Sequence, residues 1–341
     1  MFTKDSRRGD KFKKTARHFN VKVATEHLID SDDYDRSNDK DQDQDKDKDK
    51  DQGKGRKVNK QIAEETCEIL ENKSYVYNDK VVNITIVEGE TFDFRALNSI
   101  KKQPLPSLLS LPSINTSIPT SSNSSTLTET NFIVVRTTTV DAIHRFNNSD
   151  TKKLAVLSFA SAKNPGGGFL KGSQAQEESL ARATGVFATI KNSPMYEANE
   201  TDNRKCLYHD SLIFSSNVPV FRSKEDELVE TPVYVDIITV PAVNEREALK
   251  KGVSKALIDK TRFERMDSFL AVLASKNIKR ILLGAWGCGV FGGSFPDLAQ
   301  DYYSHFIEGK YKNVFEEVIF AVLDEDDMTL LEEYFLNCIS S

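Results

Sequence analysis

The chain has 341 residues, and its 46 lysines and arginines stand against 52 aspartates and glutamates, giving a formal net charge of -6. This mildly acidic balance gives no support for nucleic-acid binding through overall charge. No apolar run approaches the roughly 18 residues of a membrane helix, and no apolar N-terminal segment precedes a cleavage site. We therefore expect a protein of the cytoplasm, the nucleus or both, with reduced thiols and no membrane partner.

The cysteines and histidines give no sign of a metal site. Four cysteines and five histidines are scattered along the chain, without a CxxC motif and without histidines at ligand spacing. This pattern argues against zinc, and we expect neither a metal nor another cofactor.

Two tracts are too polar to form a core. Residues 31–52 are nearly all Asp, Lys and Gln, so we assign residues 1–55 to a disordered, charged tail. The basic stretch "RRGDKFKKTAR" in this tail fits a solvated terminus better than a nuclear-import or polyanion-binding signal. A Ser/Thr/Pro-rich tract at about 103–130 predicts a surface insertion. Residues 56–341 then form one folded domain around that insertion.

The folded part alternates helical and strand patterns along the chain. Residues 59–70 predict a helix, and the alternating run at 81–87 predicts a strand or hairpin. Further strands are predicted at 132–140, 153–161, 211–221, 233–242, 280–286 and 318–324. Further helices are predicted at 140–146, 177–190, 256–277 and 297–309. Strands that alternate with helices in this way predict an α/β fold with a largely parallel sheet.

Two glycine-rich loops follow predicted strands. The first is "NPGGGF" at 164–169, and the second is "GAWGCGVFGGSFPD" at 284–297, where Ser294 can cap the next helix. Backbone amides in such loops, with a helix start behind them, bind a diphosphate. We expect the rings of Phe169 and Phe291 to offer flat surfaces for a sugar or a base.

The second loop also contains a GxGxxG pattern at residues 287–292, which is typical of Rossmann dinucleotide sites. However, the pattern lies near the end of the chain with one predicted strand after it. The acidic residue expected about 20 positions later would fall inside a predicted helix. We therefore favour a diphosphate loop of another kind.

Gln176, Glu177 and Glu178 open the helix that follows the first loop. Carboxylates in a first turn commonly do no more than complement the helix dipole. Beside a loop that holds a nucleotide sugar, however, a carboxyl group could protonate a glycosidic oxygen.

Four motifs in order carry a resemblance to a known family. They are "SFASAKNPGGGF", the "QEE" at 176–178 that follows the three glycines after seven residues, "IITVPAVN" and "GAWGCGVFGG". From residue 56 to about 336 the chain resembles the bacterial-type, or microbial, poly(ADP-ribose) glycohydrolases. The resemblance implies a three-layer α/β/α macrodomain with a mixed, largely parallel sheet and an N-terminal helical extension. It also implies hydrolysis of ribose–ribose O-glycosidic bonds in poly(ADP-ribose), with release of ADP-ribose.

The resemblance also implies a role for each motif residue. Glu178 would be the catalytic carboxyl and Glu177, its catalytic partner, would hold the distal ribose. Gln176 would help to place the catalytic loop. The residues that would line the ribose are Asn164, Gly166, Gly167 and Gly168. Those that would wrap the diphosphate are Gly287, Cys288, Gly289, Val290 and Phe291, with the Phe291 ring against the sugar. Two departures from the family pattern are Ser158, where Asn is expected, and Val243, where Pro is expected.

In the implied reaction Glu178 acts first as an acid and then as a base. The helix start favours the charged form of Glu178, whereas a charged Glu177 and a bound diphosphate favour the neutral form of Glu178.

We expect a monomer that acts on poly(ADP-ribose) and ADP-ribosylated proteins, without sequence-specific nucleic-acid binding. Two alternatives stay open at this point: a macrodomain that only binds ADP-ribose, and an enzyme that removes protein-linked mono-ADP-ribose.

Overall fold

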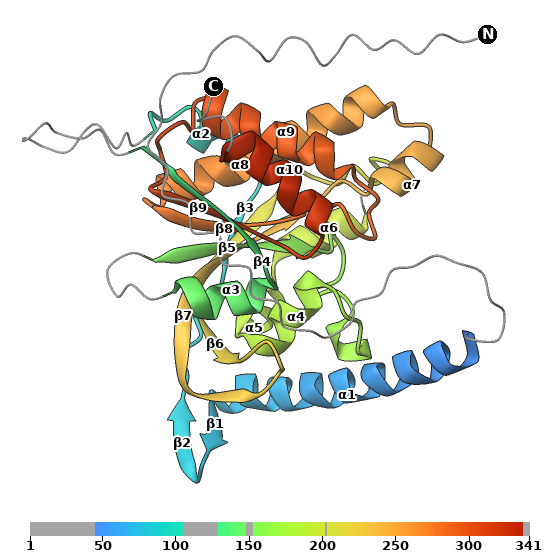
Figure 1. Cartoon of the computed structure of the whole chain (residues 1–341), viewed down its shortest axis with the longest axis vertical. Helices are drawn as coiled ribbons and strands as arrows, with labels where there is room; N and C mark the ends of the chain where they lie inside the picture. The colour runs from blue at the N-terminus through green and yellow to red at the C-terminus, as the bar shows by residue number, and fades with distance from the viewer. Residues whose placement is uncertain (1–44, 106–128, 148–152, 202, 337–341) are drawn as a thin grey trace, which may run out of the picture.

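The structure, a computed structural model, describes residues 45–105, 129–147, 153–201 and 203–336 (Figure 1). Residues 1–44 of the predicted tail and residues 106–128 of the predicted insertion lie outside the described residues. Helix α1 (Asp45–Asn72) begins before the predicted start at residue 59, so the end of the predicted tail, residues 45–55, belongs to this helix.

A seven-stranded sheet forms the centre of the molecule, in the order β3-β6-β7-β5-β8-β9-β4. Its strands are β3 (Glu90–Phe92), β4 (Asn131–Arg136), β5 (Leu154–Ala160), β6 (Leu212–Arg222), β7 (Leu228–Pro241), β8 (Arg280–Leu283) and β9 (Glu317–Val322). Parallel pairing joins β7, β5, β8, β9 and β4, whereas β6 is antiparallel to both β3 and β7. The prediction of a mixed, largely parallel sheet is confirmed.

Helices cover both faces of the sheet (Figure 1). One face carries α2 (Phe94–Lys101), α8 (Lys255–Ser275), α9 (Phe295–Tyr303) and α10 (Glu325–Phe335). The other carries α3 (Thr139–Phe146), α4 (Gln176–Ala183), α5 (Val186–Ile190) and α6 (Pro194–Glu200). The protein is therefore a three-layer α/β/α sandwich, as predicted.

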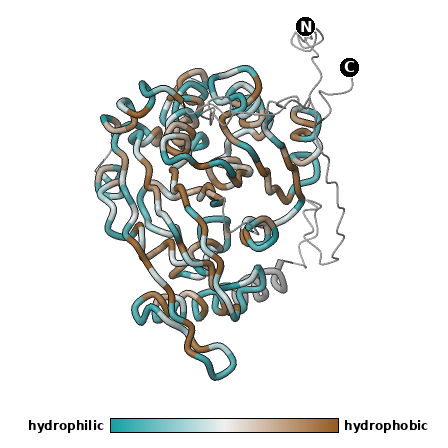
Figure 2. Tube along the Cα trace, turned by 90° about the vertical axis from the view of Figure 1, so that its left-hand side faces the viewer, coloured by the Kyte–Doolittle hydropathy of each residue, from teal (hydrophilic) through white to brown (hydrophobic). Residues whose placement is uncertain are grey.

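Strand β5 shows why the layers pack in this way. Ala155 and Leu157 belong to the core on one face of the sheet, and Leu154 and Val156 belong to the core on the other. Alternate side chains of a strand point to opposite faces, so a central strand covered on both faces is apolar at nearly every position; Ser158 is the one polar residue of β5. Figure 2 shows such hydrophobic segments in the interior of the molecule.

Several elements end elsewhere than predicted. The strand predicted at 132–140 stops at Arg136, because the side chain of Thr138 accepts the Asp141 amide and starts α3. The helix predicted at 297–309 divides into α9 and a π-helical turn, η2 (Ser304–Glu308). The run at 81–87 contributes only β2 (Lys80–Asn83), which pairs with β1 (Ser74–Tyr77) in a separate hairpin.

Helix α1 packs against α4, the helix that carries the two glutamates. The Thr66 hydroxyl donates to the Arg182 carbonyl over 2.8 Å, and both residues are buried. At Gly172, which ends the short helix η1 (Phe169–Lys171) with φ of 76°, a Cβ atom would overlap the Arg56 carbonyl oxygen. This glycine therefore permits both a left-handed turn and the close approach of α1.

The change Gly172→Ala is expected to destabilise the protein more than Gly252→Ala. Gly252 has nearly the same φ, 75°, with nothing within 4 Å of its virtual Cβ, so it reports backbone strain alone, about 1–2 kcal/mol. Gly172→Ala adds the overlap with Arg56, about another 1–3 kcal/mol. Urea unfolding of both variants measures the difference. Equal losses would contradict the close packing of α1.

Candidate functional site

Three loops leave the same edge of the sheet. Strands β7, β5 and β8 are parallel neighbours, with Ala160 opposite Pro241 and Val156 opposite Leu282. The loops that follow them, 161–168, 242–244 and 284–294, therefore start side by side at the carboxyl edge, where α/β sheets bind their ligands. This arrangement brings the two predicted glycine loops together.

The first loop is shaped by glycines in the left-handed region. Gly166 has φ of 68° and Gly167 has φ of 61°. The Gly167 amide donates to the Asn164 carbonyl over 2.9 Å, and the Asn164 amide donates to the Ser161 hydroxyl over 3.1 Å. A Cβ atom at Gly167 would lie 2.9 Å from Glu177 Oε2 and would overlap Glu178 Oε1. The loop can approach both carboxyl groups only because it lacks side chains there.

Glu177 is a buried carboxyl group, with 5 % of its surface exposed. Its Oε2 accepts the Ser161 amide over 2.7 Å, while Oε1 has no hydrogen-bond partner among the described residues. Burial, with a smaller contribution from the neighbouring Glu178, raises the pKa of Glu177 to about 8, against the lowering effect of backbone amides at Ser161, Gly166 and Gly167. Glu177 therefore keeps its proton near neutral pH.

Glu178 lies in a different environment although it is the next residue. Its side chain is partly exposed, and its Oε1 accepts the Gly168 amide over 2.9 Å. Successive residues of a helix point about 100° apart, so one carboxyl enters the protein and the other faces the loop and solvent. The sequence predicts that a charged Glu177 favours the neutral form of Glu178. Because Glu177 itself stays protonated, it supplies little of that negative charge.

Gln176 fixes the start of α4 to the sheet. Its Oε1 accepts the Phe159 amide over 2.9 Å, and its Nε2 donates to the Leu157 carbonyl over 2.8 Å. Both ends of the side-chain amide are thus used by β5. This geometry suits the predicted task of placing the catalytic loop, and it leaves little of the amide for direct contact with a ligand.

The prediction that the Phe169 ring offers a surface to a ligand is wrong. Phe169 has 0 % exposed surface, and its ring centroid lies 4.7 Å from that of Phe187 inside the core. The loop turns at the glycines and directs the next side chain inward, where burial of a large apolar ring is favourable.

The second loop presents unused backbone amides. Within the part of the chain that the structure describes, the amides of Gly289, Val290 and Phe291 donate no hydrogen bond. Val290 is 76 % exposed, and the Phe291 ring is half-buried, 6.4 Å from the ring of Tyr208. Successive free amides of this kind form an anion-binding concavity.

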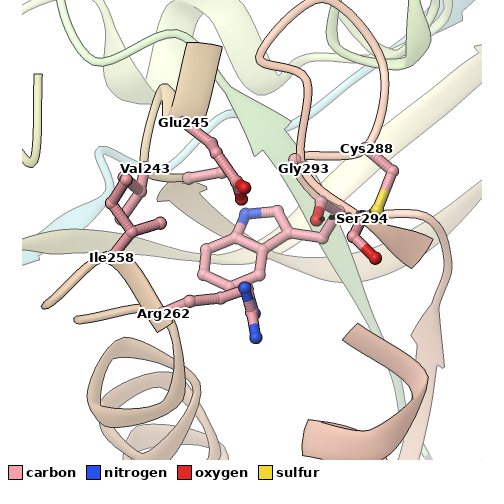
Figure 3. Close-up of a pocket in the computed structure, with 10 residues that line it drawn as sticks. Val243, Glu245, Ile258, Arg262, Cys288, Gly293 and Ser294 are labelled. Carbon is pink, nitrogen blue, oxygen red and sulfur yellow. Dashed lines mark hydrogen bonds between the residues drawn. The ribbon is translucent and has the colours of Figure 1, made fainter. Parts of the chain in front are cut away.

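Gly287 and Cys288, by contrast, hold this loop in shape through backbone hydrogen bonds. The Gly293 amide donates to the Gly287 carbonyl over 3.0 Å, and the Cys288 amide donates to the Ala285 carbonyl over 3.1 Å. The Cys288 side chain lines a small pocket behind the loop, together with Arg262 (Figure 3). Burial raises the pKa of the Cys288 thiol to about 12, so this thiol is not a ready nucleophile.

A network of ion pairs supports the helices behind the pocket. Lys255 Nζ lies 2.8–2.9 Å from carboxylate oxygens of Glu245, Asp259 and Asp297. Asp297 lies in the first turn of α9, immediately after the loop. The Glu245 carboxylate also borders the pocket itself, so the network fixes the second loop from behind.

Three further residues at this edge carry no recognisable sequence signal. Ser161 donates its amide to Glu177, and Tyr208 lies beside Phe291. Tyr196 on α6 lies near Glu177, whose negative charge, after burial, raises the pKa of the Tyr196 hydroxyl. Their positions depend on how distant segments fold together, so sequence spacing alone could not identify them.

Other kinds of site find no support in the described residues. No group of three or more His, Cys, Asp or Glu side chains there is arranged to hold a metal ion. No helix in the described ranges has both the length and the apolar character required to cross a membrane.

An α/β/α sandwich with two glycine loops at the carboxyl edge and a carboxyl pair behind the first is the arrangement of a macrodomain-like protein. Residues 63–223 match the family described as microbial-type PARG, catalytic domain, where PARG stands for poly(ADP-ribose) glycohydrolase. The chain belongs to the microbial-type poly(ADP-ribose) glycohydrolase family, which its solved relatives also show.

One such relative is the poly(ADP-ribose) glycohydrolase of Thermomonospora curvata, solved with the inhibitor ADP-HPD. It is 30 % identical, with a TM-score of 0.70 over 82 % of this chain and 99 % of that one. Another is the Deinococcus radiodurans enzyme in complex with ADP-ribose, 30 % identical, with a TM-score of 0.60 over 73 % of this chain and 94 % of that one. A comparison with curated protein sequences gives no match.

The change Glu177→Gln is expected to alter how stability depends on pH. The Glu177 pKa rises from 4.5 to about 8 on folding, so between these values the folded state holds a proton that the unfolded state has released. The wild type therefore loses stability relative to the variant as the pH rises through this window, by at most about 1.4 kcal/mol per pH unit. Urea unfolding of both proteins at about pH 5 and about pH 8 measures this, and a pH-independent difference would contradict it.

Proposed function

We propose that this protein hydrolyses the ribose–ribose O-glycosidic bonds of poly(ADP-ribose) and releases ADP-ribose. The observation that carries the proposal is the carboxyl pair on α4, which the glycine loop at 166–168 approaches closely at Gly167. The solved relatives with ADP-HPD and ADP-ribose support the same substrate class.

In this proposal the second loop binds the diphosphate of ADP-ribose. The amides of Gly289, Val290 and Phe291 donate to no acceptor in the described part of the chain, and the start of α9 behind them carries partial positive charge. The Phe291 ring packs against the sugar, while Gly287 and Cys288 hold the turn. The first loop, from Asn164 to Gly168, lines the distal ribose.

Glu178 is the proposed catalytic residue. It gives its proton to the leaving oxygen as the bond between that oxygen and the anomeric carbon breaks, and the electron pair leaves with the oxygen. The diphosphate stabilises the oxocarbenium-like ribosyl cation. Glu178, now a carboxylate held by the Gly168 amide, takes a proton from water as the water oxygen attacks the anomeric carbon. One side chain thus serves in both steps, whereas most glycosidases divide them between two.

Glu177 and Gln176 support that residue. Glu177, neutral and buried, offers a ribose hydroxyl its Oε1, which has no hydrogen-bond partner among the described residues. Gln176 binds the start of α4 to β5 and so fixes the height of both carboxyl groups above the sheet.

We further propose that the protein acts as a monomer in the cytoplasm or the nucleus on poly(ADP-ribose) and ADP-ribosylated proteins. The net charge of -6 supports partners recognised through the site rather than through a basic surface.

The change Glu178→Gln is expected to lower turnover of poly(ADP-ribose) by about 10²–10⁴-fold, because the amide can neither give nor take the proton. Binding of ADP-ribose should change little, since Gln keeps an oxygen that can accept the Gly168 amide. Glu197→Gln, on the exposed side of α6, is the matched control. Polymer degradation and calorimetric titration measure the two effects. A variant that degrades polymer at the wild-type rate would remove Glu178 from this role.

The substrate class is tested by giving the pure protein polymer and mono-ADP-ribosylated protein in parallel and measuring free ADP-ribose. Release from polymer but not from the mono-modified protein is expected. Release only from the mono-modified protein would make the enzyme a mono-ADP-ribosyl hydrolase. Binding of ADP-ribose without release from either substrate would make it a binding module.

A further inference from the structure

Three basic side chains beside the first loop have no acidic partner among the described residues. They are Arg56 and Lys57 on α1 and Lys171, the last residue of η1, and all three are exposed. No carboxylate of the described residues pairs with any of them, whereas Lys60, one turn further along α1, pairs with Glu64 over 3.7 Å. We call Arg56, Lys57 and Lys171 the rim cluster. Its positive charge is not neutralised within the described part of the chain.

Main-chain contacts between α1 and η1 bring the rim cluster together. A Cβ atom at Gly172 would lie only 3.1 Å from the Arg56 Cα, so the two backbones touch at this point. The Asn59 side-chain amide also donates to the Gly172 carbonyl over 3.4 Å. Lys171 precedes Gly172 and Lys57 follows Arg56, so three cations from distant parts of the sequence share one small area. Figure 1 shows α1 running along this side of the molecule, next to α4.

Hydrogen bonds link the rim cluster to Glu178. The Lys171 amide donates to the Gly168 carbonyl over 2.9 Å, and the Gly168 amide donates to Glu178 Oε1 over 2.9 Å. Glu177 is buried, whereas Glu178 is partly exposed. In the proposed reaction the distal ribose lies against the first loop, so the leaving part of the polymer extends from Glu178 toward solvent. The rim cluster lies on this exposed side of the carboxyl group.

We propose that the rim cluster binds the diphosphate of the next polymer unit, on the leaving-group side of the bond that is cleaved. This inference rests on the proposed function and deepens it, because it assigns a second binding site to the polymer. That diphosphate is doubly charged and is separated from the leaving oxygen by one ribose. Lysine and arginine are the side chains that bind phosphate groups in proteins. Because the chain as a whole has a net charge of -6, attraction of a polyanion requires a local cluster of this kind.

The test replaces all three cations in one variant, Arg56→Gln/Lys57→Gln/Lys171→Gln. Exposed charge pairs contribute little individually, so we expect the affinity for polymer to fall by about 10-fold at low salt. Fluorescence anisotropy in a Glu178→Gln background measures this affinity without consuming the polymer. The affinity for ADP-ribose, measured by titration calorimetry, should stay unchanged, because ADP-ribose lacks the second diphosphate.

Salt dependence is a second measurement, which a purely structural role of these residues would not change. Binding of a polyanion by exposed cations weakens as the salt concentration rises. The polymer affinity of the parent protein should therefore fall more steeply with salt than that of the triple variant, and the two should converge at about 1 M salt. Lys171→Gln alone, which leaves α1 unaltered, should lower the polymer affinity by about 2-fold at low salt.

The matched control is Arg95→Gln/Lys102→Gln/Lys279→Gln, which removes the same charge elsewhere. Arg95 and Lys102 belong to α2 and its C-terminal cap on the opposite face of the sheet, and Lys279 directly precedes β8. This control should bind polymer as the parent protein does. A rim-cluster variant that matches the control in polymer affinity and in salt dependence would overturn the proposal, as would an equal loss of ADP-ribose affinity.

Failure of the rim cluster is separable from failure of the proposed function. If only the rim-cluster assignment is wrong, the wild type still binds ADP-ribose and degrades polymer. A wild-type protein that does neither would overturn the proposed function itself, and with it this inference.

Discussion

The absence of a side chain at Gly167 is the constraint on which the carboxyl pair depends. Any Cβ there would occupy the space of Glu178 Oε1 and press on Glu177 Oε2. The loop can therefore lie directly over the start of α4, and its neighbouring amides at Ser161 and Gly168 reach the two glutamates. Ordering consecutive glycines costs more conformational entropy than ordering other residues. In return, the glycines allow the loop to hold two carboxyl groups in fixed positions.

That placement gives two adjacent, chemically identical side chains different properties. Glu177 is removed from water and keeps a proton, while Glu178 stays partly exposed with one amide donor. The difference arises from burial, which disfavours the charged form of Glu177, and not from the helix dipole, which both residues share.

The second loop is organised in a comparable way. Hydrogen bonds within the loop and the ion pairs of Lys255 fix its shape, so that the amides at its tip donate to no other described residue.

Motif spacing and apolar periodicity predicted the sheet, the two loops and the carboxyl pair, because each depends on residues close in sequence. The inward turn of Phe169 was missed, since glycine dihedrals decide which way the next side chain points. The start of α1 was missed because a run of Asp and Lys has no apolar face, although it continues a helix whose later turns are packed. Tyr196 was missed because it packs in a core built from distant segments, among them Phe169 and α4, and no local pattern encodes that meeting.

The packing of α1 on α4 has a consequence for the order of folding. Thr66 and its partner Arg182 are 116 positions apart, and Glu65 and its partner Arg222 are 157 positions apart. Contacts between such distant segments form slowly, because a long loop must close before they contribute. Helix α1 is synthesised before every strand of the sheet, but its contacts with α4 and β6 cannot form until those later segments have been synthesised. The helix that bears both glutamates thus acquires its outer support late in biosynthesis.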